Sequence, residues 1–246
     1  MEPNTRYNVG AGSFRRDGWT NLDLASEHYA PQQVGFIEYD LTSGEPLPIA
    51  DASATIIYCS HVIEHVPDVD VERLLSESYR ALMPGGVLRL VTPDIDLAYN
   101  AYVNGDVAFF RAFYPERPID HAQQIGLNCL PSEATAAQLF IHAVASQLST
   151  MDRDECGKVT DEVLAESLQT RGVAETLDIM CRMTKPGRPE NHRNWFSDVK
   201  LAHMLTRAGF ETRYRSGWLQ SRHPEMRDHK AFDPHPTFSL FMEAIR

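Results

Sequence analysis

The side chains best suited to chemistry lie between Ser60 and Val66, where His61, Glu64 and His65 follow one another closely. If this stretch opens a helix, the spacings i, i+3 and i+4 place all three on one face. Three hypotheses stay open. One histidine could act as a general base, because histidine ordinarily titrates near neutral pH. The three side chains could hold a divalent metal that acidifies a bound hydroxyl, or Glu64 could make only a structural hydrogen bond.

A second chemical feature is a glycine turn near the start of the chain. Gly10 and Gly12 follow a short strand-like stretch, and glycine lets backbone N–H groups approach a ligand closely. Asp23 comes shortly afterwards and could accept hydrogen bonds from two ribose hydroxyls. A dinucleotide fingerprint is excluded, because G-x-G-x-x-G would need glycine where Arg15 stands and an acid about 20 residues further on. This spacing argues against a dehydrogenase.

Alternating strand and helix patterns must position these residues. A helix is predicted over Val69–Met83, where apolar residues form one stripe before Pro84-Gly85-Gly86 ends it. The alternation predicts a parallel sheet with right-handed crossovers. The strands predicted before residue 97 are Arg6–Val9, Trp19–Leu24, Gly35–Asp40, Ala54–Ser60 and Val87–Thr92.

The second half of the chain divides into a helical stretch and a closing part. Residues 97–190 are mostly helical in pattern and predict an insertion after strand five, a cap for substrate binding or dimerisation. Residues 1–96 and 191–246 are predicted to form the core. The closing part is expected to contain a helix at Ser197–Ala208, with Ser197 as its N-cap and Gly209 as its end, and strands at Phe210–Ser216 and Phe238–Ile245.

Several histidines outside the first cluster receive structural interpretations. His121 and His142, in the insertion, are expected to be packed or surface residues. Arg222–Pro236, rich in histidine, proline and charge, is predicted to be a surface loop. His192, before the last helix, is a further candidate to face a ligand pocket.

Composition limits the classes of protein to which the chain could belong. The 246 residues are 43% hydrophobic and 23% charged, which fits one large domain or one domain with an insertion. A formal net charge of -11 argues against broad contact with a nucleic-acid backbone. The 4 cysteines are widely spaced without a C-x-x-C pair, so neither a zinc ribbon nor a disulfide framework is indicated. No secretory signal or membrane-spanning stretch is recognised, so a cytoplasmic location is expected.

Five segments, in order, resemble motifs of class I S-adenosylmethionine-dependent methyltransferases, especially the type 11 group of polysaccharide and secondary-metabolite pathways. Two departures occur in the glycine loop, where Asn8 and Phe14 replace the family's opening acid and last glycine. The resembling segments are Tyr7–Gly12 with Gly18–Asp23 (motif I), Asp40–Asp51 ("D-L…LPF-D"), Ser60–Val66 ("S-H-V-L-E-H-V"), Leu82–Asp94 ("L-K-P-G-G-x-L-R-I-x-x-P-D") and Asn191–Phe210 ("H…L…AGF").

This resemblance implies a Rossmann-like α/β fold with a seven-stranded, mostly parallel sheet. It also implies S-adenosylmethionine as cofactor and S-adenosylhomocysteine as product, with Gly10 and Gly12 against the methionyl part and ribose. Asp23 would accept hydrogen bonds from the ribose hydroxyls, and Asp40 would accept one from the adenine amine. The remaining implied residues are Asn8, Leu41, Ser60 and His61 at the cofactor, and His61, Glu64, His65 and Asp94 as catalytic candidates.

The reaction expected from the resemblance is an in-line methyl transfer, in which alignment of nucleophile and methyl supplies much of the acceleration. The expected acceptor is a hydroxyl of a small polar molecule, such as a sugar or glycan precursor. An aromatic hydroxyl and an N-methyl acceptor are the enzymatic alternatives. A non-catalytic module that binds the cofactor or a partner is the alternative from another class, and a homodimer through the insertion is also expected.

Overall fold

The computed structural model describes residues 5–25, 35–114, 127–186 and 188–246. The chain divides into two compact units, one made of Met1–Thr92 with Phe196–Arg246 and the other of Pro93–Trp195. Each unit has a hydrophobic core of its own.

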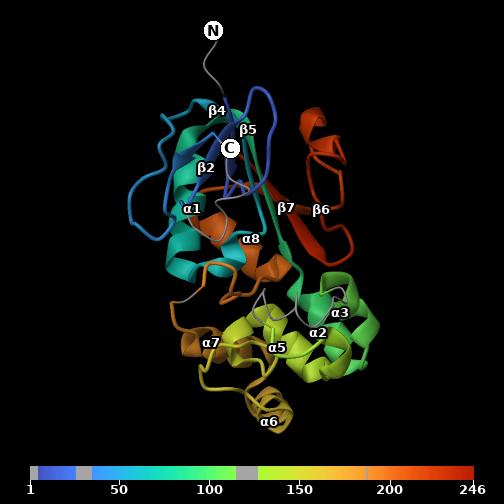
Figure 1. Cartoon of the computed structure of the whole chain (residues 1–246). Helices are drawn as coiled ribbons and strands as arrows, with labels where there is room; N and C mark the ends of the chain where they lie inside the picture. The colour runs from blue at the N-terminus through green and yellow to red at the C-terminus, as the bar shows by residue number, and fades with distance from the viewer. Residues whose placement is uncertain (1–4, 26–34, 115–126, 187) are drawn as a thin grey trace. The chain divides into compact units, whose positions relative to one another are not determined.

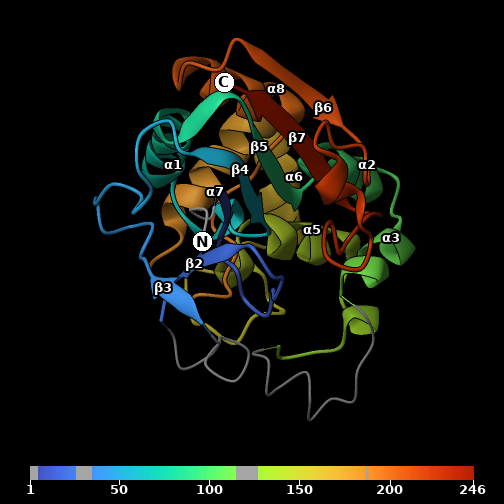
Figure 2. The same cartoon turned by 90° about the horizontal axis from the view of Figure 1, so that it is seen from above.

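The first unit is built on one sheet, which contains seven strands among the described residues in the order β3-β2-β1-β4-β5-β7-β6. Neighbouring strands from β3 to β5 run parallel, and β6 pairs antiparallel with β7. Figure 2 shows β3 and β2 at one end of this order and β7 and β6 at the other. The predicted seven-stranded, mostly parallel α/β fold is confirmed. The strands are β1 (Arg6–Val9), β2 (Thr20–Asp23), β3 (Phe36–Glu38), β4 (Ala54–Ser60), β5 (Leu82–Pro93), β6 (Thr212–Ser216) and β7 (Ser239–Ile245).

Strand β5 begins earlier than the sequence predicts, at Leu82 rather than Val87. The Pro84-Gly85-Gly86 stretch lies after the end of the preceding helix, as expected, but it belongs to the strand. The chain's last residue explains this, because Gly85 N donates to Arg246 O at 2.7 Å and Arg246 N donates to Gly86 O at 3.2 Å. These backbone bonds hold the two glycines in the sheet.

Two helices cover one face of this sheet, α1 (Asp68–Ala81) and α8 (Asp198–Arg207), and they pack against each other. Leu75 of α1 and Leu205 of α8 are fully buried in the same core as Ile57 of β4. Ser197 caps α8 as predicted, since its side chain accepts a hydrogen bond from Lys200 N. The apolar stripes of the two helices thus form one side of the core.

On the other face of the sheet, the predicted surface loop over Arg222–Pro236 is largely exposed, but a few of its residues are buried in the core, which the sequence does not predict. Met226 and Phe232 are buried against Tyr58 and Val87 of the sheet. Phe14 and Trp19 pack on the same cluster, with Phe232 5.6 Å and 5.2 Å from them between ring centroids. The connection between β1 and β2, all of which is described, contains no helix. The C-terminal segment, which includes the short turn η4 (Pro224–Arg227), covers the apolar surface left bare.

The second unit is helical among its described residues, and Figure 1 shows its elements. Phe110, Phe140 and Leu164 are fully buried in its core. His142 is also buried, at 7% exposure, while His121 lies outside the described residues. The helices are α2 (Ile95–Val103), α3 (Val107–Phe113), α5 (Ala136–Val144), α6 (Asp161–Arg171) and α7 (Val173–Met183), with the short turns η2 (Pro131–Glu133) and η3 (Ser146–Leu148). In the part of the chain that the structure describes, no helix is long and apolar enough to cross a membrane.

Candidate active site

The sheet order places the candidate site between β1 and β4. From β1 the chain continues to β2 on one side, whereas β4 and β5 lie on the other side. Ligands of open parallel sheets bind at such a switch point, outside the carboxyl ends of the strands. The glycine loop follows β1 there, and Ser60 and His61 stand at the end of β4.

Glycine suits the two loop positions for different structural reasons. Gly10 has a φ of +70°, and a Cβ there would lie 2.1 Å from Val62 Cγ2, so the loop packs directly on the segment after β4. Gly12 has a φ of +50°, and a Cβ there would have no described atom within 4 Å, which leaves open space beside the loop. Asn8, which precedes them in β1, is buried between Asn21 and Tyr58 of the neighbouring strands.

Asp23 ends β2 next to this loop. Its Oδ2 accepts a hydrogen bond of 2.7 Å from Gly12 N, and its Oδ1 accepts one of 2.8 Å from Leu24 N. The carboxylate is therefore fixed beside the glycine turn, with further lone pairs available for hydroxyl donors. An open space at Gly12, flanked by a carboxylate acceptor, fits the ribose of an adenosyl group.

Asp40 and Leu41 follow β3 at the same edge of the sheet. Tyr39 N donates to Asp23 O at 2.8 Å, which continues the pairing beyond β3. Asp40 Oδ1 accepts hydrogen bonds of 2.8 Å from both Thr42 N and Thr42 Oγ1. Leu41 is partly buried and packs against the sheet core. The carboxyl ends of β1, β2 and β3 thus carry the glycine loop, Asp23 and Asp40 in one row, whereas Ser60 and His61 lie at the end of β4.

The segment that carries His61, Glu64 and His65 does not open a helix. Ile63–His65 forms one 3-10 turn, and α1 begins only at Asp68. The reason is Pro67, because a residue before proline is pushed out of the helical region, and Val66 is extended with φ -125° and ψ 153°. The condition for placing the three side chains on one face of a helix is therefore not met.

A hydrogen-bonded array nevertheless joins His61 to its neighbours. His61 Nδ1 lies 3.1 Å from Glu64 Oε1, and His61 Nε2 lies 3.0 Å from Ser239 Oγ at the start of β7. Glu64 is 1% exposed, and its Oε2 accepts a hydrogen bond of 3.2 Å from Thr92 Oγ1. A buried carboxylate on Nδ1 favours the tautomer with its proton on Nδ1, so Nε2 is the basic nitrogen.

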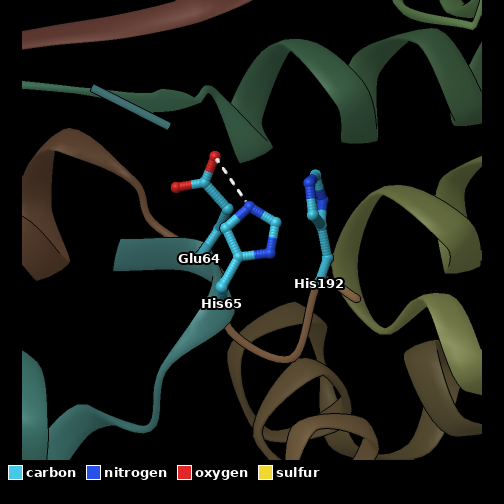
Figure 3. Close-up of side chains that lie close together, drawn as sticks. All are labelled: Glu64, His65 and His192. Atoms are coloured by element: carbon cyan, nitrogen blue, oxygen red, sulfur yellow. Dashed lines mark ion pairs between the residues drawn. The ribbon is translucent and has the colours of Figure 1, made fainter. Parts of the chain in front are cut away.

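The backbone of His61 is itself unusual, with a φ of +53°. A non-glycine residue in the left-handed region costs free energy and is found preferentially at functional sites. Here that conformation lets the His61 ring reach both Glu64 and Ser239. His65 lies near the same carboxylate oxygen, with Nε2 4.0 Å from Glu64 Oε1 (Figure 3). One buried carboxylate therefore faces two histidines.

His235, assigned to a surface loop by its sequence context, contacts His61. The two ring centroids are 4.9 Å apart at an interplanar angle of 85°, and the His235 ring stacks on Phe238 at 5.2 Å. Partial desolvation of its ring, together with the nearby His61, lowers the pKa of His235, while Glu64 opposes that shift. Local sequence carries no signal for this contact, because most of the chain lies between the two histidines.

Asp94 and His192 belong to the helical unit. Asp94 caps α2, since its Oδ1 accepts hydrogen bonds from Asp96 N at 3.0 Å and Leu97 N at 3.4 Å. It is 1% exposed. His192 Nδ1 lies 2.8 Å from Ala143 O, and His192 N donates to Ser146 Oγ at 2.9 Å. Both residues thus have structural roles within their unit, and their catalytic or pocket roles stay predictions.

Comparison with known proteins finds one family model that matches part of the chain. Residues 18–90 match the family model described as a methyltransferase domain. No curated protein sequence matches the chain.

Solved methyltransferase structures resemble the whole chain weakly. One is an S-adenosylmethionine-dependent methyltransferase from Mesorhizobium loti, with 16% identity, coverage of 99% of this chain and 93% of that one, and a TM-score of 0.41. A possible histamine N-methyltransferase from Thermotoga maritima has 14% identity, coverage of 100% and 84%, and a TM-score of 0.44. Another, from Archaeoglobus fulgidus, has 10% identity, coverage of 98% and 85%, and a TM-score of 0.43.

The matched domain contains β2, β3, β4, α1 and most of β5. The resembling motifs extend beyond it on both sides. Residues 18–90 are therefore the part of the chain that is similar to a methyltransferase domain.

Proposed function

We propose that the chain is a class I S-adenosylmethionine-dependent methyltransferase, and that it methylates a hydroxyl oxygen of a small polar acceptor, such as a sugar or glycan precursor. The observation that supports this is the array Glu64–His61–Ser239 at the carboxyl end of β4. A neutral hydroxyl is a weak nucleophile near pH 7, so its transfer benefits from a positioned base, whereas a neutral amine attacks without one. A sugar rather than an aromatic hydroxyl is proposed from the resemblance to polysaccharide-pathway enzymes.

The cofactor would lie along the carboxyl ends of β1, β2 and β3. Gly10 and Gly12 would pass close to its methionyl part and ribose. Asp23 would accept hydrogen bonds from the ribose hydroxyls, and Asp40 would accept one from the adenine amine. S-adenosylmethionine supplies an electrophilic methyl group: the sulfur–methyl bond breaks as the acceptor oxygen–methyl bond forms, and S-adenosylhomocysteine remains. Asn8, Leu41 and Ser60 would support this site from the strand ends.

His61 is the proposed general base. The acceptor hydroxyl would replace the Ser239 hydroxyl at His61 Nε2, and the acceptor proton would pass to that nitrogen as the new oxygen–methyl bond forms. Glu64, hydrogen-bonded to Nδ1, would stabilise the imidazolium that results. His65 lies next to the same carboxylate and would interact with it electrostatically.

Two measurements test this function. Calorimetric titration with S-adenosylhomocysteine should show binding, and absence of binding at millimolar ligand contradicts the cofactor assignment. Transfer of labelled methyl groups to separate panels of sugars, aromatic hydroxyls and amines should select the sugars. Transfer to amines alone overturns the O-methylation proposal.

A metal held by His61, Glu64 and His65 is the second interpretation of the same residues. His61→Ala and His65→Ala, each assayed with and without a chelator, separate the two. A base role predicts that His61→Ala lowers the rate by about 10²-fold or more and that the chelator has no effect. A metal role predicts loss of activity on chelation. Full activity in both variants and in the chelated enzyme makes the cluster structural.

The location and partners are proposed from composition and from the resemblance. We propose a cytoplasmic enzyme without a nucleic-acid substrate, in keeping with the net charge of -11. The helical unit is proposed to contribute to acceptor binding or to a homodimer. Sedimentation of the full chain at several concentrations tests the dimer.

A further inference from the structure

The C-terminal segment Asp233–Ser239 reaches the edge of the sheet where ligands bind. Ser239 begins β7, and its hydroxyl lies 3.0 Å from His61 Nε2 at the end of β4. β7 is also the neighbour of β5, whose Thr92 contacts Glu64. The residues just before β7 therefore approach the carboxyl ends of β4 and β5.

Within this segment, His235 and Phe238 form a stacked pair at His61. Their rings are 5.2 Å apart at an interplanar angle of 20°, and Phe238 lies 6.0 Å from the His61 ring. Phe238 is buried at 5% exposure, whereas His235 is exposed. Phe238 thus supports an imidazole that presents its remaining surface to solvent beside the proposed base.

A buried ion pair fixes the start of the same segment. Asp233 accepts hydrogen bonds from Arg89 Nε at 3.1 Å and from Leu219 N at 3.2 Å. Its own N–H donates to Tyr58 Oη at 2.9 Å. Arg89 and Asp233 side chains are both 0% exposed, and Asp233 has a φ of +55°. A charge pair in this environment holds its partners strongly, because separating them leaves an uncompensated buried charge.

The two halves of the ligand edge differ in their side chains. The ends of β1, β2 and β3 carry the glycine loop, Asp23 and Asp40, which suit an adenosyl group. The ends of β4, β5 and β7 carry His61, Glu64 and Ser239 instead. An acceptor that loses its proton to His61 has to lie on this second half, where His235 is exposed.

From this arrangement we infer that the segment Asp233–Ser239 forms one wall of the acceptor site, that His235 contacts the acceptor, and that the Arg89–Asp233 pair positions His235. The inference rests on the proposed function, because it uses the cofactor position and the acceptor-side role of His61.

The test does not need the natural acceptor. The probe is an S-adenosylmethionine analogue in which a propargyl group replaces the transferable methyl, so that the larger group enters the acceptor site. Calorimetry gives the Kd of the analogue and of S-adenosylmethionine for each variant, and the ratio of the first Kd to the second reports on the space beyond the sulfur. His235→Ala should lower this ratio by about ten-fold, since it removes a side chain from the wall. His229→Ala, an exposed histidine of the same C-terminal part of the chain, should leave the ratio unchanged.

Asp233 is tested as a positioning residue with its own control. Asp233→Asn weakens the pair with Arg89 and should lower the same ratio while S-adenosylmethionine still binds. Glu243→Gln removes the other carboxylate on Arg89, 3.0 Å from its Nη1, and should leave the ratio unchanged. A merely structural role of Asp233 predicts equal effects of the two substitutions on the ratio.

The outcomes separate this inference from the proposed function. If neither ligand binds the wild-type enzyme, the cofactor site is wrong and the inference fails with it. If both bind, and His235→Ala leaves the ratio unchanged, the function stands and the acceptor wall is overturned. A lowered ratio in His235→Ala, with an unchanged one in His229→Ala, supports the wall.

Discussion

At the scale of single residues, Gly10 offers the sharpest prediction about the cofactor loop. A Cβ there would lie 2.1 Å from Val62 Cγ2, and the backbone φ is +70°. Gly10→Ala should therefore combine a steric clash with left-handed strain, lowering the free energy of unfolding by about 2–4 kcal/mol. The displaced loop should also weaken binding of S-adenosylhomocysteine. Urea unfolding and calorimetry measure the two effects.

Gly12 is the matched control for Gly10. Its φ is +50°, but a Cβ would meet no atom of the described residues within 4 Å. Gly12→Ala should cost only the left-handed strain, about 1–2 kcal/mol. Adding Val62→Ala to Gly10→Ala should recover part of the loss, because it removes the clash. Equal losses in the two single variants would show that contact with Val62 is unimportant.

Asp23 is predicted to bind the ribose hydroxyls of the cofactor. Asp23→Ala removes the acceptor of the Gly12 N–H bond and of the proposed ribose hydroxyls, and it should weaken S-adenosylhomocysteine binding by about 10²-fold. Calorimetry with S-adenosylhomocysteine and with free adenine separates the two contributions, since adenine lacks the ribose. Asp17→Ala, an exposed acid of the same region, serves as the control. An unchanged affinity in Asp23→Ala removes the ribose role.

At the scale of elements, the C-terminal segment that covers the sheet can be tested by its largest anchor. Phe232 is 1% exposed and packs on Trp19, Phe14 and Tyr58. Phe232→Ala should lower the free energy of unfolding by about 3–5 kcal/mol, through lost burial and the cavity left behind. Lys230→Ala, at an exposed neighbour, should have little effect. Similar urea midpoints for both variants would show that Phe232 does not anchor this segment on the sheet.

The elements predicted best are those whose signal is local. Ala54–Ser60 is one continuous apolar run and forms β4 over those residues, and Ser197 is an N-cap whose side-chain bond is present. Val66-Pro67 is also a local signal, and it explains why α1 does not extend back to His61. Sequence spacing alone does not distinguish a single turn from a helix start, because both bring His61 near Glu64.

The rest of the site depends on tertiary contacts that the sequence does not reveal. His235, Ser239 and Asp233 belong to a polar, proline-rich region whose composition is typical of surface loops. They reach His61 and Arg89 because the β1–β2 connection, described throughout, lacks a helix and leaves a sheet face to be covered. The short distance from Gly12 to β2 is visible in the sequence, but the segment that covers the exposed face is not.

At the scale of the whole molecule, the two units differ in how buried charge is arranged. The sheet unit contains Arg89, whose guanidinium is held by Asp233 and Glu243, so positive and negative charges are buried together. The helical unit contains His142, whose Nδ1 is buried without a hydrogen-bond partner among the described residues. A buried imidazole near Arg188 and Lys158 stays neutral, and the helical unit should therefore lose stability in mild acid.

Burial first, and then the neighbouring His192, Arg188 and Lys158, lower the pKa of His142 from 6.5 to about 3. In the unfolded chain His142 titrates with its ordinary pKa, so below about pH 6.5 the unfolded state binds a proton that the folded state does not. Its stabilising contribution is therefore complete above that pH. It is lost at about 1.4 kcal/mol per pH unit as the pH falls toward 3.

This pH dependence can be assigned to His142 by comparing variants. The free energy of unfolding should be measured in urea between pH 7 and pH 4 for the wild type, His142→Gln and His203→Gln, the last an exposed histidine of α8. Because His142→Gln removes the titrating group, its stability should fall less steeply with acid than that of the wild type. His203→Gln should follow the wild type. Parallel curves for all three would place the acid sensitivity of the molecule elsewhere and leave His142 without a role in it.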